Sequence, residues 1–255
     1  MNDASHPSGP LTLSIDIGGS RLKASVLSVT GRMITQPNRT DTPHPATPEA
    51  VVAGLLGVVE PLGAFDRISI GFPGVVRRGR VLTAPNLGTP FWHDYPLADV
   101  LAERLGKPAR MLNDATVQGL GVISGHGLEC VITLGTGMGF ALFDRGYPAP
   151  HLELSQHPVR KGMTYDQWIG NAALQKLGAK SWNRRVRKAI GIIATLVTYD
   201  TLAIGGGNAK RLDFKLPLGV RTVSNEAGIT GGIRLWDSLL DPLFVAEDAM
   251  ALPVR

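Results

Sequence analysis

The feature of this chain that most constrains its fold is a hairpin that occurs twice, each time as an apolar strand, a tight turn of small residues and a second apolar strand. The first copy spans residues 11–27 around a turn at 16–20, and the second spans residues 130–143 around a turn at 134–139. Turns without Cβ atoms let several backbone N–H groups converge on one anion. Two such turns predict that successive phosphates are held from opposite sides of a cleft, as in a two-lobed phosphotransferase.

The length and composition of the chain allow two compact lobes and no membrane span. Its 255 residues are 44% hydrophobic, which is enough for two cores of ordinary domain size. No stretch approaches the ~20 apolar residues that cross a bilayer. Residues 1–10 are polar and contain Pro and Gly, so they predict a loose tail and not a signal peptide. The single cysteine, Cys130, cannot form an internal disulfide, and a cytoplasmic location is expected.

Basic side chains outnumber acidic ones by 26 to 21, which gives a net charge of +5. This balance suits an acidic partner but does not choose between a nucleotide, polyphosphate and nucleic acid. Because aromatic residues are sparse and do not alternate with basic ones, nucleic acid is not expected as a partner. One helical stretch is strongly basic, and it is either a solvated face or a track for an elongated polyanion. Its cations are Lys176, Lys180, Arg184, Arg185, Arg187 and Lys188.

The order of expected elements indicates an α/β fold built from a duplication, with mixed sheets in two lobes. Besides those of the hairpins, the expected strands are residues 32–37, 67–72, 109–112 and 201–204. The expected helices are residues 49–62, 97–105, 115–123, 165–177, 182–199 (interrupted at most by Gly191) and 227–235. The predicted division is a tail (1–10), an N-terminal lobe (11–115), a C-terminal lobe (116–235) and a second tail (236–255). The last helix is a candidate to pack back on the N-terminal lobe.

Two carboxylates stand where phosphoryl-transfer chemistry would need them. Asp16 ends the first strand beside the glycine turn, where it could hold Mg²⁺ next to phosphates, and Lys23 on the returning strand could add a point charge. Asp114 follows a strand and opens a helix, a position that faces the usual ligand crevice of α/β proteins. Transfer to an alcohol needs such a carboxylate near the attacking hydroxyl. Asx residues also cap helices, so Asn113 could cap while Asp114 accepts the proton.

Further polar residues suit a polyhydroxylated ligand, although solvent exposure is an alternative for each. Asn86, Asn113 and Glu153 supply the required mixture of donors and acceptors, whereas His151 and His157 lack the spacing of metal ligands. The glycine run at residues 205–207 could pass close to an adenine and ribose, or it could only turn the chain. It lacks the spacing of a dinucleotide fingerprint.

Taken in order, these motifs resemble those of the ROK sugar kinases over about residues 11–237. Each motif alone is weak, and the ordered set is specific. The short chain and the segment at residues 133–143 are most similar to polyphosphate glucokinases. The motifs are residues 16–20, 71–74, 85–86, 113–115, 134–139 and 205–207.

The resemblance implies an actin-like (ribonuclease H-like) fold whose two lobes hold a sugar and a phosphoryl donor between them, and a homodimer. It makes Asp114 the general base and places Asp16 beside Mg²⁺, with ATP or polyphosphate as donor. The implied sugar-binding residues are Asn86, Asn113, Glu153 and Gly74. The implied phosphate-binding residues are Gly18, Gly19, Ser20, Lys23, Gly135, Thr136 and Gly137. The implied nucleotide-binding residues are Gly205, Gly206 and Gly207.

The chain departs from the family pattern at three places, one of which is the absence, at residues 119–122, of the glutamate that is common after the helix opened by Asp114. With one cysteine it cannot build the family's cysteine-rich zinc motif, so no zinc is expected. Ser155 and Gln156 replace a Gly-His pair, so one sugar contact is missing or is supplied by Gln156 or His157. The sequence therefore predicts a Mg²⁺-dependent hexose kinase acting on the 6-hydroxyl of glucose. A sugar sensor that binds without phosphorylating is the alternative, and a filament-forming actin-like protein is a weaker one.

Overall fold

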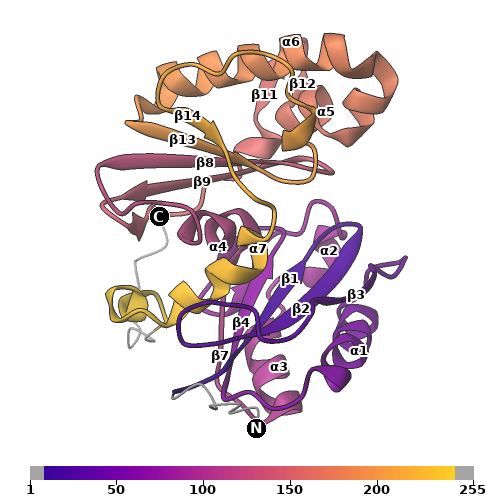
Figure 1. The fold of residues 1–255 in the computed structure, drawn as a ribbon. Coiled ribbons are helices and arrows are strands. Elements are labelled where there is room, and N and C mark those ends of the chain that lie inside the picture. Colours follow the sequence, from indigo (N-terminus) through magenta and orange to yellow (C-terminus); the bar gives the residue numbers. More distant parts are fainter. Residues whose placement is uncertain (1–8, 245–255) are drawn as a thin grey trace, which may run out of the picture.

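The computed structural model describes residues 9–244, which build two five-stranded sheets, one in each half of the molecule (Figure 1). In the first sheet the order is β3-β2-β1-β4-β7, and in the second it is β10-β9-β8-β13-β14. The strands of the first are β1 (Thr12–Ile17), β2 (Arg21–Leu27), β3 (Asn38–Asp41), β4 (Arg67–Phe72) and β7 (Ala109–Asn113). Those of the second are β8 (Leu128–Leu134), β9 (Met138–Asp144), β10 (Tyr147–Pro148), β13 (Thr201–Gly205) and β14 (Val220–Thr222).

The two sheets repeat one topology. Each begins with an antiparallel hairpin, β1–β2 or β8–β9, and the first strand of that hairpin then pairs in parallel with a later strand, β4 or β13. A further parallel strand, β7 or β14, completes each sheet. The expected duplicated, actin-like α/β fold with mixed sheets is confirmed, and the two hairpin turns occupy equivalent places in its halves.

Two helices cover each sheet and bury an apolar core against it. On the first sheet, Thr47 caps helix α1 (Pro48–Val59) by accepting a hydrogen bond from the Ala50 N–H at 3.3 Å, and Pro48 takes the first helical position. On the second sheet, Trp182 is fully buried and donates its Nε1–H to the Ile169 carbonyl at 2.7 Å. These helices are α1 and α3 (Leu97–Leu105) on the first sheet, with α5 (Tyr165–Ile169) and α6 (Asn171–Val197) on the second.

Short elements complete the described chain. The helical ones are α2 (Thr89–Trp92), α4 (Asp114–Leu120), α7 (Ala227–Thr230) and the 3₁₀ turns η1 (Glu60–Leu62), η2 (Leu154–Gln156), η3 (Ala209–Arg211), η4 (Gly231–Trp236) and η5 (Ser238–Leu243). The extended ones are the hairpins β5 (Val76–Arg77) with β6 (Arg80–Val81) and β11 (Pro158–Arg160) with β12 (Met163–Thr164).

Helix α4 and the C-terminal segment join the two halves. Helix α4 contacts β4 of the first sheet and β8 and β9 of the second. After β14 the chain returns to the first sheet, where Ser14 Oγ donates to the Ile229 carbonyl and Ser69 Oγ to the Gly232 carbonyl, each at 2.7 Å. The segment α7–η4 thus packs on β1 and β4, although it follows the second sheet in the chain.

The boundary expected at residue 236 is wrong. Residues 236–243 do not form a tail, because Arg110 pairs with Asp241 at 2.8 Å and lies 4.4 Å from the centre of the Trp236 ring. Leu240 is also buried. The first eight residues and residues 245–255, on which the remainder of both expected tails falls, lie outside the described part of the chain.

Several element boundaries also differ from expectation for local reasons. The strand expected at residues 32–37 does not form, because the Thr35 hydroxyl accepts the Val26 N–H at 2.9 Å in place of a strand carbonyl, and β2 pairs with β3 instead. The expected helix at residues 165–177 divides at the extended Gly170. Helix α6 bends at Gly178, whose φ is 71°, and not at Gly191. The last helix changes to 3₁₀ at Gly231, where a Cβ would stand 2.0 Å from the Val117 carbonyl oxygen.

Candidate active site

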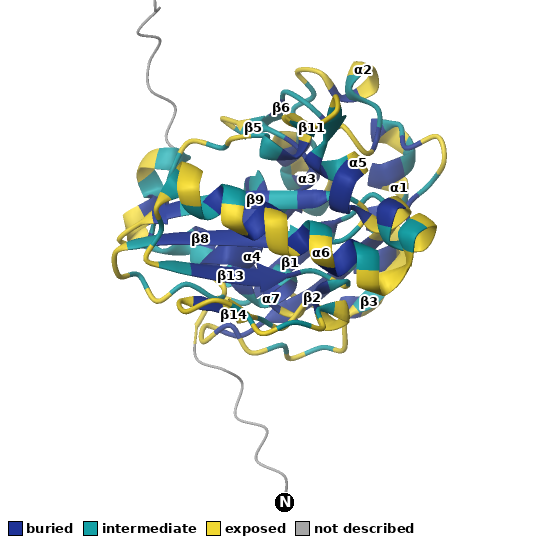
Figure 2. Cartoon of the chain, turned by 90° about the horizontal axis from the view of Figure 1, so that it is seen from above, coloured by how far each residue is buried: buried dark blue, intermediate teal, exposed yellow. Residues whose placement is uncertain are grey.

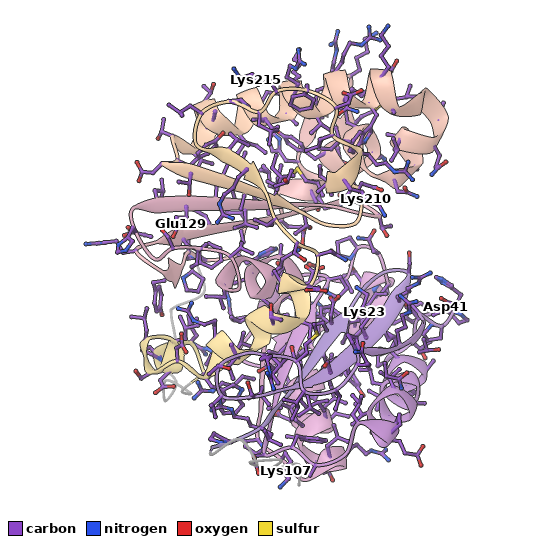
Figure 3. All side chains as sticks on the ribbon, viewed as in Figure 1. Lys23, Asp41, Lys107, Glu129, Lys210 and Lys215 are labelled. Atoms are coloured by element: carbon purple, nitrogen blue, oxygen red, sulfur yellow. The ribbon has the colours of Figure 1, made fainter. Side chains whose placement is uncertain are left out.

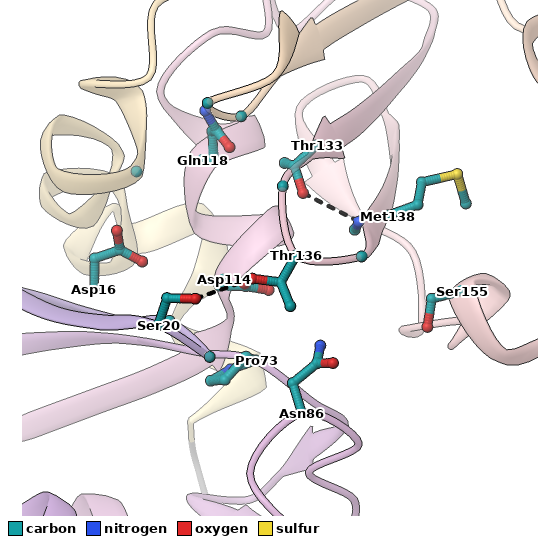
Figure 4. Close-up of a pocket in the computed structure, with 18 of the residues that line it drawn as sticks. Asp16, Ser20, Pro73, Asn86, Asp114, Gln118, Thr133, Thr136, Met138 and Ser155 are labelled. Carbon is teal, nitrogen blue, oxygen red and sulfur yellow. Dashed lines mark hydrogen bonds between the residues drawn. The ribbon is translucent and has the colours of Figure 1, made fainter. Parts of the chain in front are cut away.

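A cleft of about 470 Å³ separates the two sheets, and both glycine turns border it. The first turn is closed by a hydrogen bond from the Gly18 N–H to the Arg21 carbonyl at 2.9 Å, and the second by one from the Gly135 N–H to the Gly137 carbonyl at 3.0 Å. Ser20 Oγ lies 3.4 Å from Thr136 Oγ1, so the two turns meet across the cleft (Figure 4). The two hairpins therefore face each other.

The cleft gathers nearly all of the predicted site residues. Gly205 is the predicted residue that does not line it, because it ends β13 and packs against Gln118. The predicted residues that line the cleft are Asp16, Gly18, Gly19, Ser20, Lys23, Gly74, Asn86, Asn113, Asp114, Gly135, Thr136, Gly137, Glu153, Gly206 and Gly207.

Asn113 combines capping with positioning. Its Oδ1 accepts hydrogen bonds from the N–H groups of Ala115 at 2.9 Å and Thr116 at 3.2 Å, and so caps α4. Its Nδ2 donates to the Gly74 carbonyl at 3.1 Å and to the Phe72 carbonyl at 3.4 Å. The amide is thus engaged within the protein on both sides. It holds the first residue of α4, Asp114, at the edge of the cleft.

The carboxyl group of Asp114 is tuned toward proton transfer. Burial is the largest cause of its raised pKa, and the negative charges of Asp16 and Glu153 raise the pKa further, to about 7. The Ala115 N–H donates to its Oδ1 at 2.8 Å and opposes the shift only in part. A carboxylate with a pKa near neutrality, facing a cleft, suits a general base.

This raised pKa predicts a pH-dependent stability difference between the wild type and Asp114→Asn in metal-free buffer. Below about pH 4 the carboxyl is protonated in both the folded and the unfolded protein. Between about pH 4 and 7 the folded protein holds a proton that the unfolded chain releases, so the stability of the wild type falls as pH rises through this window. The asparagine carries no such penalty, and the variant should gain up to about 4 kcal/mol relative to the wild type. Denaturant unfolding at a series of pH values measures this, with Asp99→Asn as the control, and parallel curves for wild type and Asp114→Asn would refute it.

Asp16 and Lys23 lie opposite each other in the β1–β2 register and form an ion pair of 2.8 Å. The cleft lining contains four carboxylates and only two cations, Arg21 and Lys23. A phosphate chain would be repelled by this lining unless a divalent cation accompanied it. Mg²⁺ is commonly held by one or two carboxylates together with substrate phosphates, and Asp16 beside the first turn fits that pattern. The residues of this site therefore fit a magnesium ion that the donor brings, and not an all-protein cage.

Glu153 lies in a hydrogen-bonded loop on the far side of the cleft. Burial raises the pKa of its carboxyl, but hydrogen bonds from His151 and Ser155 outweigh burial and leave the pKa below its ordinary value. The residues that replace Gly-His are engaged in the protein, since Ser155 donates to Glu153 and Gln156 donates to Asp166 at 3.0 Å. His157 does not line the cleft. The carboxylate of Glu153 is thus held ionised, as an acceptor for sugar hydroxyls requires.

Sequence reasoning missed Asp166, which supports the second glycine turn. Its Oδ1 accepts the Met138 N–H at 2.7 Å, and a Cβ on Gly137 would stand 2.2 Å from the same oxygen. The turn therefore needs glycine there for a carboxylate to approach it. Asp166 lies 28 residues from Met138, at the start of α5. No local signal in the sequence connects the two.

Gln118 is a second residue that sequence reasoning missed. It is 5% exposed, it lines the cleft, and its Nε2 has no hydrogen-bond partner among the described residues. The amide fills the space beside Gly205, where a Cβ would stand 2.6 Å from Nε2. Leaving such a donor unpaired costs about 1–3 kcal/mol, so we expect a ligand oxygen to occupy this place. A polar side chain on the buried face of α4 was the signal available.

We therefore expect Gln118→Met to raise the KM of the phosphoryl donor about tenfold, because one hydrogen bond to a charged oxygen is lost. The KM of the sugar should not change, and the ligand-free variant should unfold at the same denaturant concentration as the wild type or a higher one. Initial rates at varied donor concentration measure the first effect. An unchanged donor KM would show that the amide serves only the fold.

Two further observations limit what the described chain can bind or do. Among residues 9–244, no group of three or more His, Cys, Asp or Glu side chains is placed to hold a metal ion. None of the helices in this part is long and apolar enough to span a bilayer.

Comparison with known proteins places the chain among sugar kinases. The polyphosphate glucokinase of Mycobacterium leprae is 29% identical over 234 residues, which cover 85% of this chain and 72% of that protein. The crystal structure of the inorganic polyphosphate/ATP-glucomannokinase from Arthrobacter sp. strain KM superposes with a TM-score of 0.81 at 28% identity, over 89% of this chain and 98% of the other. The ROK family glucokinase from Streptomyces griseus, in complex with glucose and AMPPNP, shares the fold with a TM-score of 0.72 at 20% identity, over 88% and 98%.

The model of the ROK family matches residues 12–148, from the start of β1 to the end of β10. This segment contains both glycine turns, Asn86, Asn113 and Asp114, and it makes up more than half of the chain. The protein belongs to the ROK family.

Proposed function

We propose that this protein is a Mg²⁺-dependent hexose kinase that transfers a phosphoryl group from polyphosphate or ATP to the 6-hydroxyl of glucose. The observation that carries the proposal is the position of Asp114, a carboxylate with a pKa near 7 on the same cleft as two facing glycine turns. A surface cap would need neither the raised pKa nor the turns. The similarity to a polyphosphate glucokinase and to a polyphosphate/ATP-glucomannokinase supports the same class of reaction here.

The reaction follows from the roles of the cleft residues. Asn86 and Glu153 bind and orient the sugar hydroxyls, and Asp114 accepts the proton of the attacking hydroxyl as its oxygen bonds to the terminal phosphorus. The bridging P–O bond of the donor breaks at the same centre, which leaves a donor shorter by one phosphate. Backbone N–H groups of the two turns and the Lys23 ammonium hold the phosphate oxygens in line. When bound at Asp16, Mg²⁺ would neutralise charge that develops on the phosphates.

For Asn113 we propose a role other than the direct sugar contact that the resemblance implies. Because its amide is already engaged by α4 and by the carbonyls of Phe72 and Gly74, we assign it to positioning Asp114 and the backbone at Gly74. A direct contact to the sugar would have to exchange one of these bonds. The expected homodimer and the cytoplasmic location stay predictions, and sedimentation of the purified protein measures the first.

A coupled assay tests the function. Purified protein, Mg²⁺ and a panel of hexoses are combined with ATP or polyphosphate, and the sugar phosphate is measured. Glucose should be phosphorylated with at least one donor. Measurable sugar binding without phosphate transfer from any donor would overturn the kinase and favour the sugar sensor, for which the Ser155–Gln156 pair is the motivating feature.

A further inference from the structure

The positive charge of this protein is concentrated away from the cleft. The cleft lining has four carboxylates against two cations, whereas α6 carries six cations and no acidic residue. These six exceed the net charge of the whole chain, which is +5. The positive electrostatic potential that attracts a long polyanionic donor therefore lies on α6. The cleft, where only the terminal phosphates of the donor react, lacks this potential.

A groove of about 350 Å³ lies along this helix, between α6, α5 and β11. It has four cations and no acidic residue in its lining. Hydrogen bonds within the protein hold two of these cations in place. Arg185 donates to the Trp168 carbonyl at 3.0 Å, and Arg184 donates to Ser181 Oγ at 3.1 Å. Figure 2 shows that exposed residues alternate with buried ones along α6, so one face of the helix is open to solvent. The lining residues are Arg160, Trp168, Leu177, Ser181, Arg184, Arg185 and Lys188.

The charge of the groove is not neutralised by the described protein. None of its four cations forms an ion pair with an acidic residue within residues 9–244. The segment from residue 167 to residue 199 contains no Asp or Glu. Several unpaired like charges in one concave surface repel each other, and an anion bound among them removes that cost.

We propose that this groove binds a remote stretch of inorganic polyphosphate while the terminal phosphates occupy the cleft. The proposal rests on the proposed function, because it takes polyphosphate as the donor. Only the short helix α5 lies between the two sites. Its residue Asp166 lines the cleft, and the carbonyl of Trp168, two residues later, accepts a hydrogen bond from Arg185 of the groove. The α5–α6 junction also abuts the second turn, since the Asn171 N–H donates to the Gly135 carbonyl at 3.0 Å. A chain that spans both sites gains affinity by multivalency, which a short donor cannot do.

The lining favours polyphosphate over single-stranded nucleic acid. Sequence-independent binding of nucleic acid combines cations with aromatic side chains on which bases stack. The one aromatic residue of the groove, Trp168, is 3% exposed and its ring is buried in the second core. The groove thus offers charge and hydrogen-bond donors without a stacking surface, as a chain of phosphates requires.

The test compares a groove variant, Arg160→Gln with Arg184→Gln and Lys188→Gln, with a matched control, Arg32→Gln with Arg104→Gln and Lys107→Gln. Arg185 is kept because of its bond to Trp168. The control removes the same charge, and Figure 3 shows Lys107 at the opposite end of the molecule from α6. Binding of long-chain polyphosphate to the full chain, without sugar, is measured over a range of salt concentrations. The groove variant should bind at least about tenfold more weakly, with a slope of log affinity against log salt smaller by about two.

In kinetics, the groove variant should raise the KM of long-chain polyphosphate, whereas the KM values of tripolyphosphate, ATP and glucose, and kcat, should match the wild type. Three results would overturn the proposal. The first is an equal affinity of wild type and groove variant for polyphosphate, and the second is an equal loss of affinity in the control variant. The third is a higher affinity of the wild type for single-stranded DNA than for polyphosphate of matched charge, lost in the groove variant. The two proposals fail separately. If no sugar is phosphorylated by any donor, the proposed function is wrong, and the binding measurement still decides the groove.

Discussion

Asp114→Asn is expected to lower kcat by roughly a hundredfold to ten-thousandfold, the range that a general base contributes, with little change in the affinity for glucose. Asparagine has the shape of aspartate and its side-chain oxygen can still accept the Ala115 N–H, so α4 and the sugar-binding residues should keep their places. Its amide cannot take the proton of the attacking hydroxyl at any pH. Removal of the charge also leaves Asp16 and Glu153 with one like-charged neighbour fewer.

The measurement needs both a rate and a binding constant, because a misfolded variant would also be inactive. Initial rates with saturating donor give kcat, and calorimetric titration with glucose gives the affinity. Asp99→Asn is the matched control, since it makes the same chemical change on α3, at an exposed position outside the cleft. A kcat of Asp114→Asn within about threefold of the wild type, together with normal glucose binding, would show that another group takes the proton.

The parts of the site that could be predicted from the sequence are those in which chemistry and local structure coincide. Each glycine turn is a short segment whose small residues determine the hairpin. Asp114 could be predicted because it lies at the end of a strand and begins a helix. The repeat of the hairpin was enough to predict that the two turns face each other. The distance between Ser20 and Thr136, 3.4 Å, fits this prediction.

The parts that could not be predicted depend on tertiary contacts without a local pattern. Asp166 belongs to the site only because α5 folds against the second turn, and Gln118 because α4 packs below the glycine run. The return of residues 227–243 to the first sheet depends on Ser14 and Ser69, which read as ordinary strand residues in the sequence. The position of the bend in α6 was predicted wrongly for the same reason. The sequence does not distinguish Gly178 from Gly191, and only the structure shows that Gly178 has the positive φ.

The second large effect is expected for Asp16→Asn, which should lower kcat about a hundredfold or more if Asp16 holds the metal, since charge neutralisation by a bound cation is worth several kcal/mol in phosphoryl transfer. The Mg²⁺ concentration that gives half the maximal rate should rise. A direct readout is calorimetric titration of Mg²⁺ in the presence of a non-transferable donor analogue, where the variant should bind the ion more weakly.

Lys23→Gln distinguishes a metal ligand from a partner in an ion pair. Both variants lose the 2.8 Å contact between Lys23 and Asp16, but only Asp16→Asn loses the carboxylate. If that ion pair were all that mattered, the two variants would lose similar activity and both would bind Mg²⁺ like the wild type. If Asp16 holds the ion, Lys23→Gln should retain most of the metal affinity or exceed it, because a competing cation has left the carboxylate. Its loss of rate should be about tenfold, the effect of one missing charge on the phosphates. Equal Mg²⁺ affinity in Asp16→Asn and the wild type would therefore remove Asp16 from the metal site and leave it as the group that fixes Lys23.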